Sequence, residues 1–333
     1  MQIAATTSTP GTSRRSRRRY GVSHVVDEPG DWFISAEIIA PTVAPDAEQL
    51  TVLCCSPGGG CTGQYFDLGG PDSGFSFAQY AVDAGFACIL IDNLATGQSS
   101  RGESRWVSPQ SVARANAEGF AQATEELRSG LPASVGVATV GIGHSMGAML
   151  TLMAQAMIGQ HVAIACLGFT PSGLPDVLSP DELHIANAGP VSFETLLSLA
   201  RQRFSESGRP SVGQQTNSPF PFVLPDTDPA ALKALAATTT NLLPLPATLS
   251  LLPGNIVQYI RQITAPVFIG GGDHEPWHKA ADLVPIFEDS NDISFYSLID
   301  SAHNHNVAAT RELLWRRMLG WAAAVVANRP PKL

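Results

Sequence analysis

A serine lies between two glycines at residues 143–147, in the order Gly-His-Ser-Met-Gly. An apolar run at 135–142 precedes this stretch, and a run rich in small apolar residues follows at 146–156. The context predicts a strand, a sharp turn and a helix, with Ser145 at the turn. A serine that projects from a strained turn needs neighbours without bulk, which glycine supplies on both sides. We therefore interpret Ser145 as a nucleophile whose hydroxyl attacks a carbonyl carbon.

This stretch resembles the nucleophile elbow of the α/β-hydrolase superfamily, and two upstream segments extend the resemblance. The apolar run 88–92 leads into a loop that ends in Gly97-Gln98-Ser99, as after the fourth strand of many of these enzymes. The apolar run 50–55 leads into Ser56-Pro57-Gly58-Gly59-Gly60, at the place of the family's oxyanion-hole loop. The family's usual histidine is absent there, and a serine or a proline stands in its place. The resemblance covers nearly all of the chain from residue 21 onward.

The resemblance implies an α/β fold, a mostly parallel central sheet with helices on both faces, and the alternation of apolar and helical segments agrees. Residues 32–39 alternate in polarity like an antiparallel strand at the edge of the sheet. From Thr170 to Thr264 the alternation stops, and Pro, Ser, Thr, Asn and Leu dominate. Because a structureless loop of that length is unusual in a compact domain, we expect an inserted lid over 170–264, with short helices near 192–200 and 229–235. The predicted core is 21–169 and 265–330.

A nucleophilic serine needs a base and an acid that orients the base. The family places its acid after a late core strand and a glycine turn, and Asp273 follows such a segment here. The family's histidine follows the next strand, where His303 comes after a small residue. The resemblance thus implies a triad of Ser145, Asp273 and His303, in the chain order typical of this fold. Glu275 is the alternative acid, and His305 is the alternative base.

The negative charge that develops on the attacked carbonyl oxygen requires hydrogen-bond donors. The first helical amide after the serine belongs to Met146. Pro57 has no amide proton, so we expect the second donor to be Gly58 or Gly59. The triad would form an acyl-enzyme that water then clears, a mechanism that requires no dinucleotide, metal or flavin, and no cofactor is predicted. His144, beside the nucleophile, is predicted to serve in packing.

The composition limits the classes of partner. The 333 residues carry a formal net charge of −9, which argues against a nucleic-acid partner because such a partner requires a basic surface. No apolar run reaches the roughly 18 residues of a membrane span. The expected partner is a small-molecule substrate with a hydrophobic portion, as the triad and the apolar lid imply. Of the five cysteines, Cys61 lies beside the glycine loop and is a candidate reactive thiol. The other four lie in apolar runs and are expected to be reduced core residues.

The N-terminal residues differ in composition from the rest of the chain. Residues 1–19 contain five arginines and no acidic residue. We interpret residues 1–20 as a disordered basic tail. The composition also fits an organellar transit peptide, but no apolar segment typical of secretion follows the arginines, so we expect a cytoplasmic protein.

The residues together predict a serine hydrolase that cleaves a carboxylic ester or lactone. The apolar, proline-rich lid favours a substrate with a hydrophobic body. Relatives with an aspartate nucleophile, such as epoxide hydrolases and haloalkane dehalogenases, are disfavoured because the elbow residue is Ser145. The same triad also serves C–C hydrolases, thioesterases, acyltransferases and hydroxynitrile lyases, since a fold does not fix a reaction. A non-catalytic ligand-binding protein is the other alternative, and the complete predicted triad argues against it.

Overall fold

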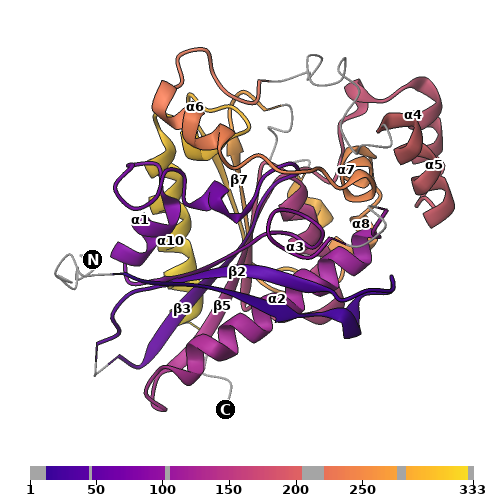
Figure 1. Ribbon diagram of the computed structural model, residues 1–333. Helices are drawn as coiled ribbons and strands as arrows, with labels where there is room; N and C mark the ends of the chain where they lie inside the picture. Colours follow the sequence, from indigo (N-terminus) through magenta and orange to yellow (C-terminus); the bar gives the residue numbers. More distant parts are fainter. Residues whose placement is uncertain (1–12, 45–46, 102–105, 205–220, 276–282, 329–333) are drawn as a thin grey trace.

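A mostly parallel sheet forms the centre of the molecule (Figure 1). The computed structural model describes residues 13–44, 47–101, 106–204, 221–275 and 283–328. The strands described are β1 (Arg14–Gly21), β2 (Phe33–Ala40), β3 (Gln49–Ser56), β4 (Ala87–Ile91), β5 (Gly136–His144), β6 (Ala163–Leu167), β7 (Val267–Gly272) and β8 (Ile293–Leu298). Their order across the sheet is β1-β2-β4-β3-β5-β6-β7-β8. Neighbours from β4 to β8 are parallel, whereas β2 is antiparallel to both β1 and β4. The predicted α/β fold is confirmed.

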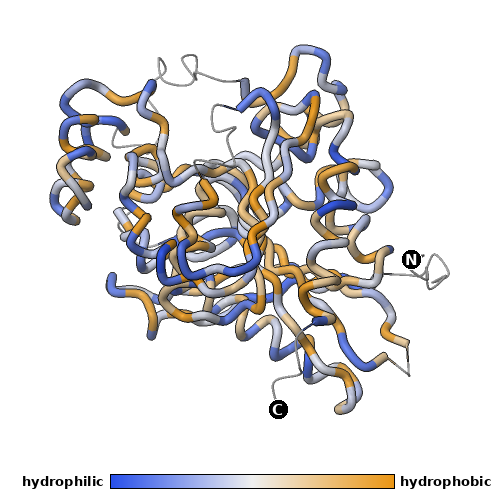
Figure 2. The backbone as a smooth tube through the Cα atoms, turned by 180° about the vertical axis from the view of Figure 1, so that it is seen from behind, coloured by the Kyte–Doolittle hydropathy of each residue, from blue (hydrophilic) through white to orange (hydrophobic). Residues whose placement is uncertain are grey.

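Helices cover both faces of this sheet, and those of the described residues that flank it include α1 (Phe77–Asp83), α2 (Pro109–Ser129), α3 (Met146–Ile158) and α10 (Arg311–Ala327). In β6, Ile164 and Cys166 pack on the side of α2 and α3, and Ala165 packs on the side of α1 and α10. Because successive strand residues point to opposite faces, a strand covered on both must be apolar throughout. Figure 2 shows the most hydrophobic stretches running through the middle of the molecule. No helix of the described ranges is both long and apolar enough to cross a membrane.

The chain leaves the sheet between β6 and β7, over the residues predicted as a lid. The α-helices described there are α4 (Pro180–Asn187), α5 (Phe193–Arg203), α6 (Pro229–Ala236), α7 (Pro244–Leu251) and α8 (Val257–Ile260). The stretch predicted at 192–200 corresponds to α5, with Ser192 as its N-cap, and the stretch predicted at 229–235 lies in α6. Part of this insertion lies on the glycine loop after β3. The Thr62 amide donates to the Thr238 carbonyl at 2.9 Å, and the Thr240 amide donates to the Gly60 carbonyl at 2.8 Å. The insertion therefore contacts the carboxyl ends of the parallel strands.

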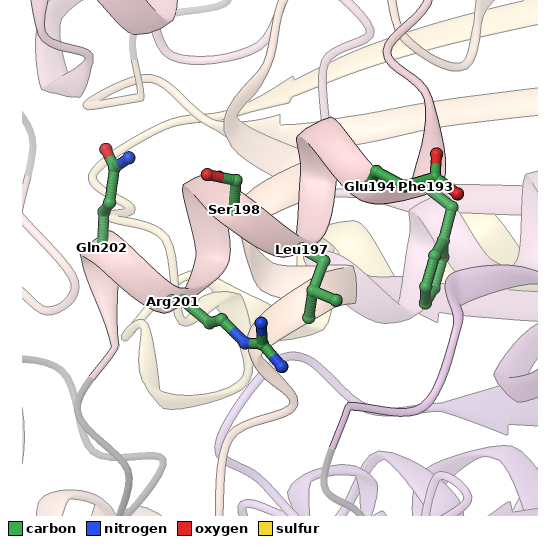
Figure 3. A pocket seen from close by; sticks show the side chains of 6 residues that line it. All are labelled: Phe193, Glu194, Leu197, Ser198, Arg201 and Gln202. Atoms are coloured by element: carbon green, nitrogen blue, oxygen red, sulfur yellow. The ribbon is translucent and has the colours of Figure 1, made fainter.

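A surface hollow of about 530 Å³ lies along α5. Figure 3 shows the side chains that line it, which are Phe193, Glu194, Leu197, Ser198, Arg201 and Gln202. A larger hollow, of about 940 Å³, includes Gly136 at the start of β5, the end of that strand opposite Ser145. None of the predicted catalytic residues lines either hollow.

The N-terminal arginines lie in a strand, so the predicted tail over residues 1–20 is wrong for Arg14–Tyr20, and residues 1–12 lie outside the described part of the chain. β1 pairs with β2 along its whole length. The strand predicted at 32–39 is therefore antiparallel, as expected, but β1 and not β2 forms the edge. Charged side chains suit an edge strand because they oppose pairing with another sheet. Arg17, for example, forms an ion pair of 2.6 Å with Glu37 on β2.

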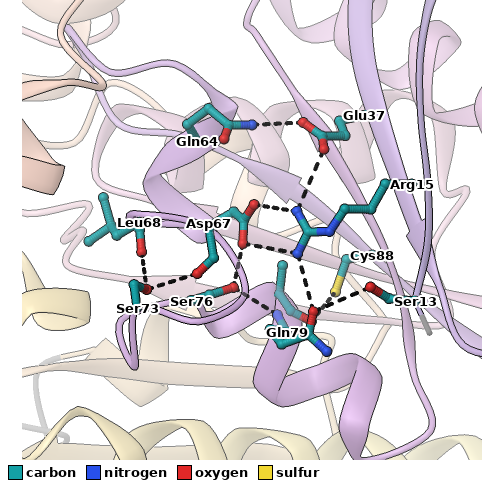
Figure 4. Close-up of polar contacts among 12 residues, drawn as sticks. Ser13, Arg15, Glu37, Gln64, Asp67, Leu68, Ser73, Ser76, Gln79 and Cys88 are labelled. Carbon is teal, nitrogen blue, oxygen red and sulfur yellow. Dashed lines mark hydrogen bonds and ion pairs between the residues drawn. The ribbon is translucent and has the colours of Figure 1, made fainter. Parts of the chain in front are cut away.

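Arg15 joins this edge strand to the segment before α1 (Figure 4). Its guanidinium lies 2.6 Å from a carboxylate oxygen of Asp67, whose side chain is buried, and 3.2 Å from the amide oxygen of Gln79. The Ser76 hydroxyl, the N-cap of α1, donates to the same Asp67 carboxylate. The buried negative charge of Asp67 thus depends on an arginine from the N-terminal strand.

We predict that Arg15→Ala lowers the free energy of unfolding by about 1–3 kcal/mol, because it leaves the buried Asp67 carboxylate without its cation. The matched control is Arg14→Ala, on the same strand but exposed, which should change the stability by no more than about 0.5 kcal/mol. Urea unfolding followed by circular dichroism measures both. Equal effects of the two substitutions would contradict the role given to β1.

Candidate active site

Ser145 occupies the turn between β5 and α3, as the sequence predicts. Its backbone has φ 54° and ψ −125°, a conformation that non-glycine residues rarely adopt. The turn is crowded: a Cβ atom at Gly143 would lie 2.4 Å from the Ala148 Cα, and one at Gly147 would lie 2.3 Å from the Ser56 carbonyl oxygen. The two glycines of the motif are therefore required by close backbone approach.

His303 lies within hydrogen-bond distance of the serine. Its Nε2 is 3.0 Å from the Ser145 hydroxyl oxygen, and its Nδ1 is 2.6 Å from Oε1 of Glu275. Because a carboxylate only accepts hydrogen bonds, Nδ1 carries the proton and Nε2 is left to accept one from the serine. The arrangement can take a proton from Ser145 while the carboxylate stabilises the resulting imidazolium.

The structure corrects the predicted acid, because Glu275 and not Asp273 contacts His303. The Asp273 carboxylate accepts the amides of Asp300 and Ser301, each at 3.1 Å, and its side chain is 37% exposed. The Asp273 amide continues the ladder of β7 with β8, by donating to Leu298. The chain turns back after Asp273, and this turn places Glu275 at the end of β7.

Glu275 is held at the end of β7 by the turn that follows the strand. Its amide donates to the Gly272 carbonyl at 3.2 Å, and the Gly272 amide donates to its Oε2 at 2.7 Å. The side chain is 1% exposed, and burial by itself would raise its pKa. The electrostatic and hydrogen-bond interactions with His305 and His303 outweigh burial and hold the pKa of Glu275 well below its ordinary value. The carboxylate is therefore ionised at neutral pH.

The alternative base, His305, faces Glu275 and not the serine. Its Nε2 lies 2.8 Å from Oε2 of Glu275, so the two histidines contact opposite oxygens of one carboxylate. Gly168, at the end of β6, makes room for this cluster. Its φ is +59°, and a Cβ atom there would lie 3.1 Å from both Oε1 of Glu275 and Cε1 of His305. The sequence analysis did not identify Gly168, although a glycine directly after a buried strand marks such a close approach.

His144 does more than the predicted packing. Its ring stacks on Tyr65 with 4.4 Å between centroids, and its Nε2 donates to the His303 carbonyl oxygen at 2.8 Å. Burial, and then the neighbouring histidines, lower the pKa of His144 well below its ordinary value, so the ring is neutral. His144, which precedes Ser145, thus helps to fix the main chain of His303, which contacts Ser145.

The glycine loop lies against the start of α3. A Cβ atom at Gly58 would be 3.2 Å from the Ser145 Cβ, and one at Gly59 would be 3.5 Å from the Met146 sulfur. Met146 is the first residue of α3, so its amide has no acceptor within the helix. A buried Asn93 fixes the loop, since its side-chain amide donates to the Pro57 carbonyl at 3.0 Å. The candidate oxyanion donors, Met146 and either Gly58 or Gly59, therefore lie on the turn after Ser145 and on the loop packed against it, and their role remains a prediction.

The cysteines divide as the sequence suggests, although the thiol beside the loop is not activated. Cys54, Cys55, Cys88 and Cys166 are buried and free. Cys61 is partly buried, and burial raises its pKa more than the hydrogen bond with Thr238 lowers it. Cys61 is therefore a protonated thiol at neutral pH, and a thiolate is the form that reacts.

The insertion between β6 and β7 reaches the site at Phe222 and Leu242. The Phe222 ring centroid lies 5.4 Å from that of His303, and its side chain is half exposed. The His303 amide donates to the Pro221 carbonyl at 3.3 Å. Leu242 lies beside the glycine loop, with its Cδ1 2.6 Å from where a Gly59 Cβ would be. Apolar side chains of the insertion thus lie beside His303 and beside the glycine loop.

Comparison with known proteins shows the family to which this chain belongs. The family profile described as alpha/beta hydrolase matches residues 52–313, and no curated protein matches the chain. Similar solved structures include the peroxisomal alpha/beta-hydrolase Lpx1 of Saccharomyces cerevisiae, with 11% identity, a TM-score of 0.60 and coverage of 96% of this chain and 92% of that chain. A haloalkane dehalogenase DbeA variant of Bradyrhizobium elkanii has 15% identity, a TM-score of 0.58 and coverage of 94% and 98%. A carboxylesterase of Nitrososphaera gargenis has 16% identity, a TM-score of 0.55 and coverage of 90% and 97%. These structures share the fold, and the family profile, which spans most of the sequence, shows that the chain belongs to the alpha/beta hydrolase family.

Proposed function

We propose that the protein is a serine hydrolase that cleaves carboxylic esters or lactones through Ser145, His303 and Glu275. The proposal is supported by two hydrogen bonds in series: His303 contacts the Ser145 hydroxyl through Nε2 and the buried Glu275 carboxylate through Nδ1. A nucleophile, a base and an orienting acid at these distances form the arrangement used for acyl transfer.

In this proposal the geometry sets the order of proton movements. His303 Nε2 takes the Ser145 proton as the serine oxygen attacks the carbonyl carbon, and the proton then passes to the leaving alcohol. Glu275 stabilises the imidazolium between these steps. The amides of Met146 and of Gly58 or Gly59 hold the oxyanion, and each such donor contributes about 3 kcal/mol to transition-state stabilisation. Water, activated by the same histidine, then hydrolyses the acyl-enzyme.

The substrate proposed is uncharged near the scissile bond and carries a hydrophobic group. Phe222 and Leu242 place apolar side chains next to His303 and next to the glycine loop. We propose that residues 170–264, which include both, act as a lid that selects substrates. Ligands of open α/β sheets bind at the carboxyl ends of the strands, where this insertion contacts the core. Similarity to a carboxylesterase agrees with an ester substrate.

The first prediction from the proposed function is that Ser145→Ala reduces hydrolysis of a panel of p-nitrophenyl esters and lactones to less than about a thousandth of the wild-type rate, while thermal stability is retained. The serine oxygen is the nucleophile, and alanine fits the crowded turn. Product analysis by mass spectrometry should find an acid and an alcohol, or the hydroxy acid from a lactone. Retention of a larger rate, or failure of a fluorophosphonate probe to label wild-type Ser145, would reject the nucleophile.

The second prediction separates the two acidic residues. Glu275→Gln should lower kcat by about 10²–10⁴-fold, because a neutral amide neither stabilises the imidazolium nor fixes the required proton position on His303. Asp273→Asn is the matched control, since it also removes one charge two residues away, and it should leave kcat within about twofold of wild type. The opposite ranking in steady-state assays would restore Asp273 as the acid.

The third prediction concerns the lid. Phe222→Ala should change the kcat/KM ratio between a long-chain and a short-chain ester by roughly ten- to two-hundredfold, because one apolar contact with the substrate is lost. Phe193→Ala is the matched control, since Phe193 is similarly exposed, at 46% against 48%, but lies on α5 in the hollow of Figure 3. Fluorophosphonate labelling of Ser145 should persist in both variants. An unchanged preference in Phe222→Ala would show that this residue does not contact the substrate.

A further inference from the structure

Each oxygen of the Glu275 carboxylate has its own histidine. Oε1 lies 2.6 Å from Nδ1 of His303, and Oε2 lies 2.8 Å from Nε2 of His305. The Gly272 amide also donates to Oε2, at 2.7 Å. The proposed reaction uses the first of these contacts and leaves the second without a role.

The contacts of His305 fix its proton. Nε2 lies 2.8 Å from Oε2 of Glu275 and 3.1 Å from the Gly272 amide nitrogen. The amide makes its shorter contact, 2.7 Å, with Oε2, so Nε2 carries the hydrogen and donates to the carboxylate. Nδ1 is buried and has no hydrogen-bond partner among the residues that the structure describes. A proton on Nδ1 would be a buried donor without an acceptor, which is unfavourable. His305 therefore donates through Nε2 to Glu275, and its side chain is 1% exposed.

A carboxylate held at one oxygen can rotate about its last side-chain bond, and rotation would move Oε1 away from His303. Donors on both oxygens remove this freedom. The site is built closely around both rings, since a Cβ atom at Gly168 would lie only 3.1 Å from Cε1 of His305 and 3.2 Å from Cε1 of His303. His303 and His305 also belong to one short loop, in which the His305 amide donates to the His303 carbonyl at 3.2 Å.

We propose that His305 is a positioning residue, which holds the second oxygen of Glu275 and thereby fixes the oxygen that orients His303. The proposal rests on the proposed function of Ser145, His303 and Glu275. His305 exchanges no proton with the substrate in this arrangement. It acts only through the carboxylate.

The arrangement also predicts a change in pH dependence. The titratable groups of the described residues that face His305 are Glu275 at the end of β7, His303 on the same loop, His144 at the end of β5 and Tyr65 before α1. His144 is neutral, and burial raises the pKa of Tyr65 well above its ordinary value, so Glu275 carries the charge. Without the His305 donor, this charge is balanced by His303 alone, which favours the protonated base. The acidic limb of kcat/KM should then move to higher pH.

The test compares three substitutions that differ in reach. His305→Leu removes both nitrogens at similar volume. His305→Gln places an amide donor near the position of Nε2, and His305→Asn places one near Nδ1, out of reach of Glu275. We expect kcat of His305→Leu and of His305→Asn to fall about ten- to a hundredfold with little change in KM. Their acidic limbs should move upward by about half a pH unit. His305→Gln should recover most of the loss in kcat.

Thermal unfolding and Ser145→Ala accompany these measurements as controls. If His305→Leu does not fold, the comparison of Gln with Asn still decides. Equal losses in both amide variants, without a shift of the acidic limb, would show a purely structural residue, and wild-type kcat in all three would also overturn the proposal. Turnover that survives Ser145→Ala would instead reject the proposed function, so the two failures are distinguishable.

Discussion

The crowded main chain around Ser145 is the constraint on which the rest of the site depends. Ser145 has a positive φ, and its amide donates to the Leu167 carbonyl at the end of the neighbouring strand β6. Gly147 brings the start of α3 against the Ser56 carbonyl at the end of β3. The turn at Ser145 therefore connects the carboxyl ends of three adjacent parallel strands, β3, β5 and β6. The nucleophile and the proposed oxyanion loop have fixed positions because their backbones are in contact.

The buried charge of Glu275 is the second constraint, and it accounts for His305 and Gly168 as well as for His303. An ionised carboxylate in a buried position needs donors on both oxygens. His303, His305 and the Gly272 amide supply them. Gly168 is needed because two rings and a carboxylate fill the space where a side chain would lie.

Local features of the site could be predicted from the sequence, whereas features that depend on the path of a loop could not. The elbow around Ser145 and the glycine loop follow from steric rules that act within a few residues. The choice between Asp273 and Glu275 depends on the turn after β7, because the first still continues the ladder with β8 and only the second turns inward. Both are acidic, so composition does not distinguish them. The edge strand β1 was missed because its arginines suggest a solvated tail, and their partners, Glu37 and Asp67, are distant in sequence.

The main chain of His303 shows how the insertion and the core act on the same group. On the core side, the neutral His144 ring donates to the His303 carbonyl. On the side of the insertion, the Pro221 carbonyl accepts the His303 amide. The proposed base therefore has its peptide groups fixed from both directions, before its ring contacts Ser145 or Glu275. Phe222 follows Pro221 directly, and its ring meets the His303 ring edge to face. The residue proposed to contact substrate and the residue proposed to take the Ser145 proton are therefore held by one set of hydrogen bonds.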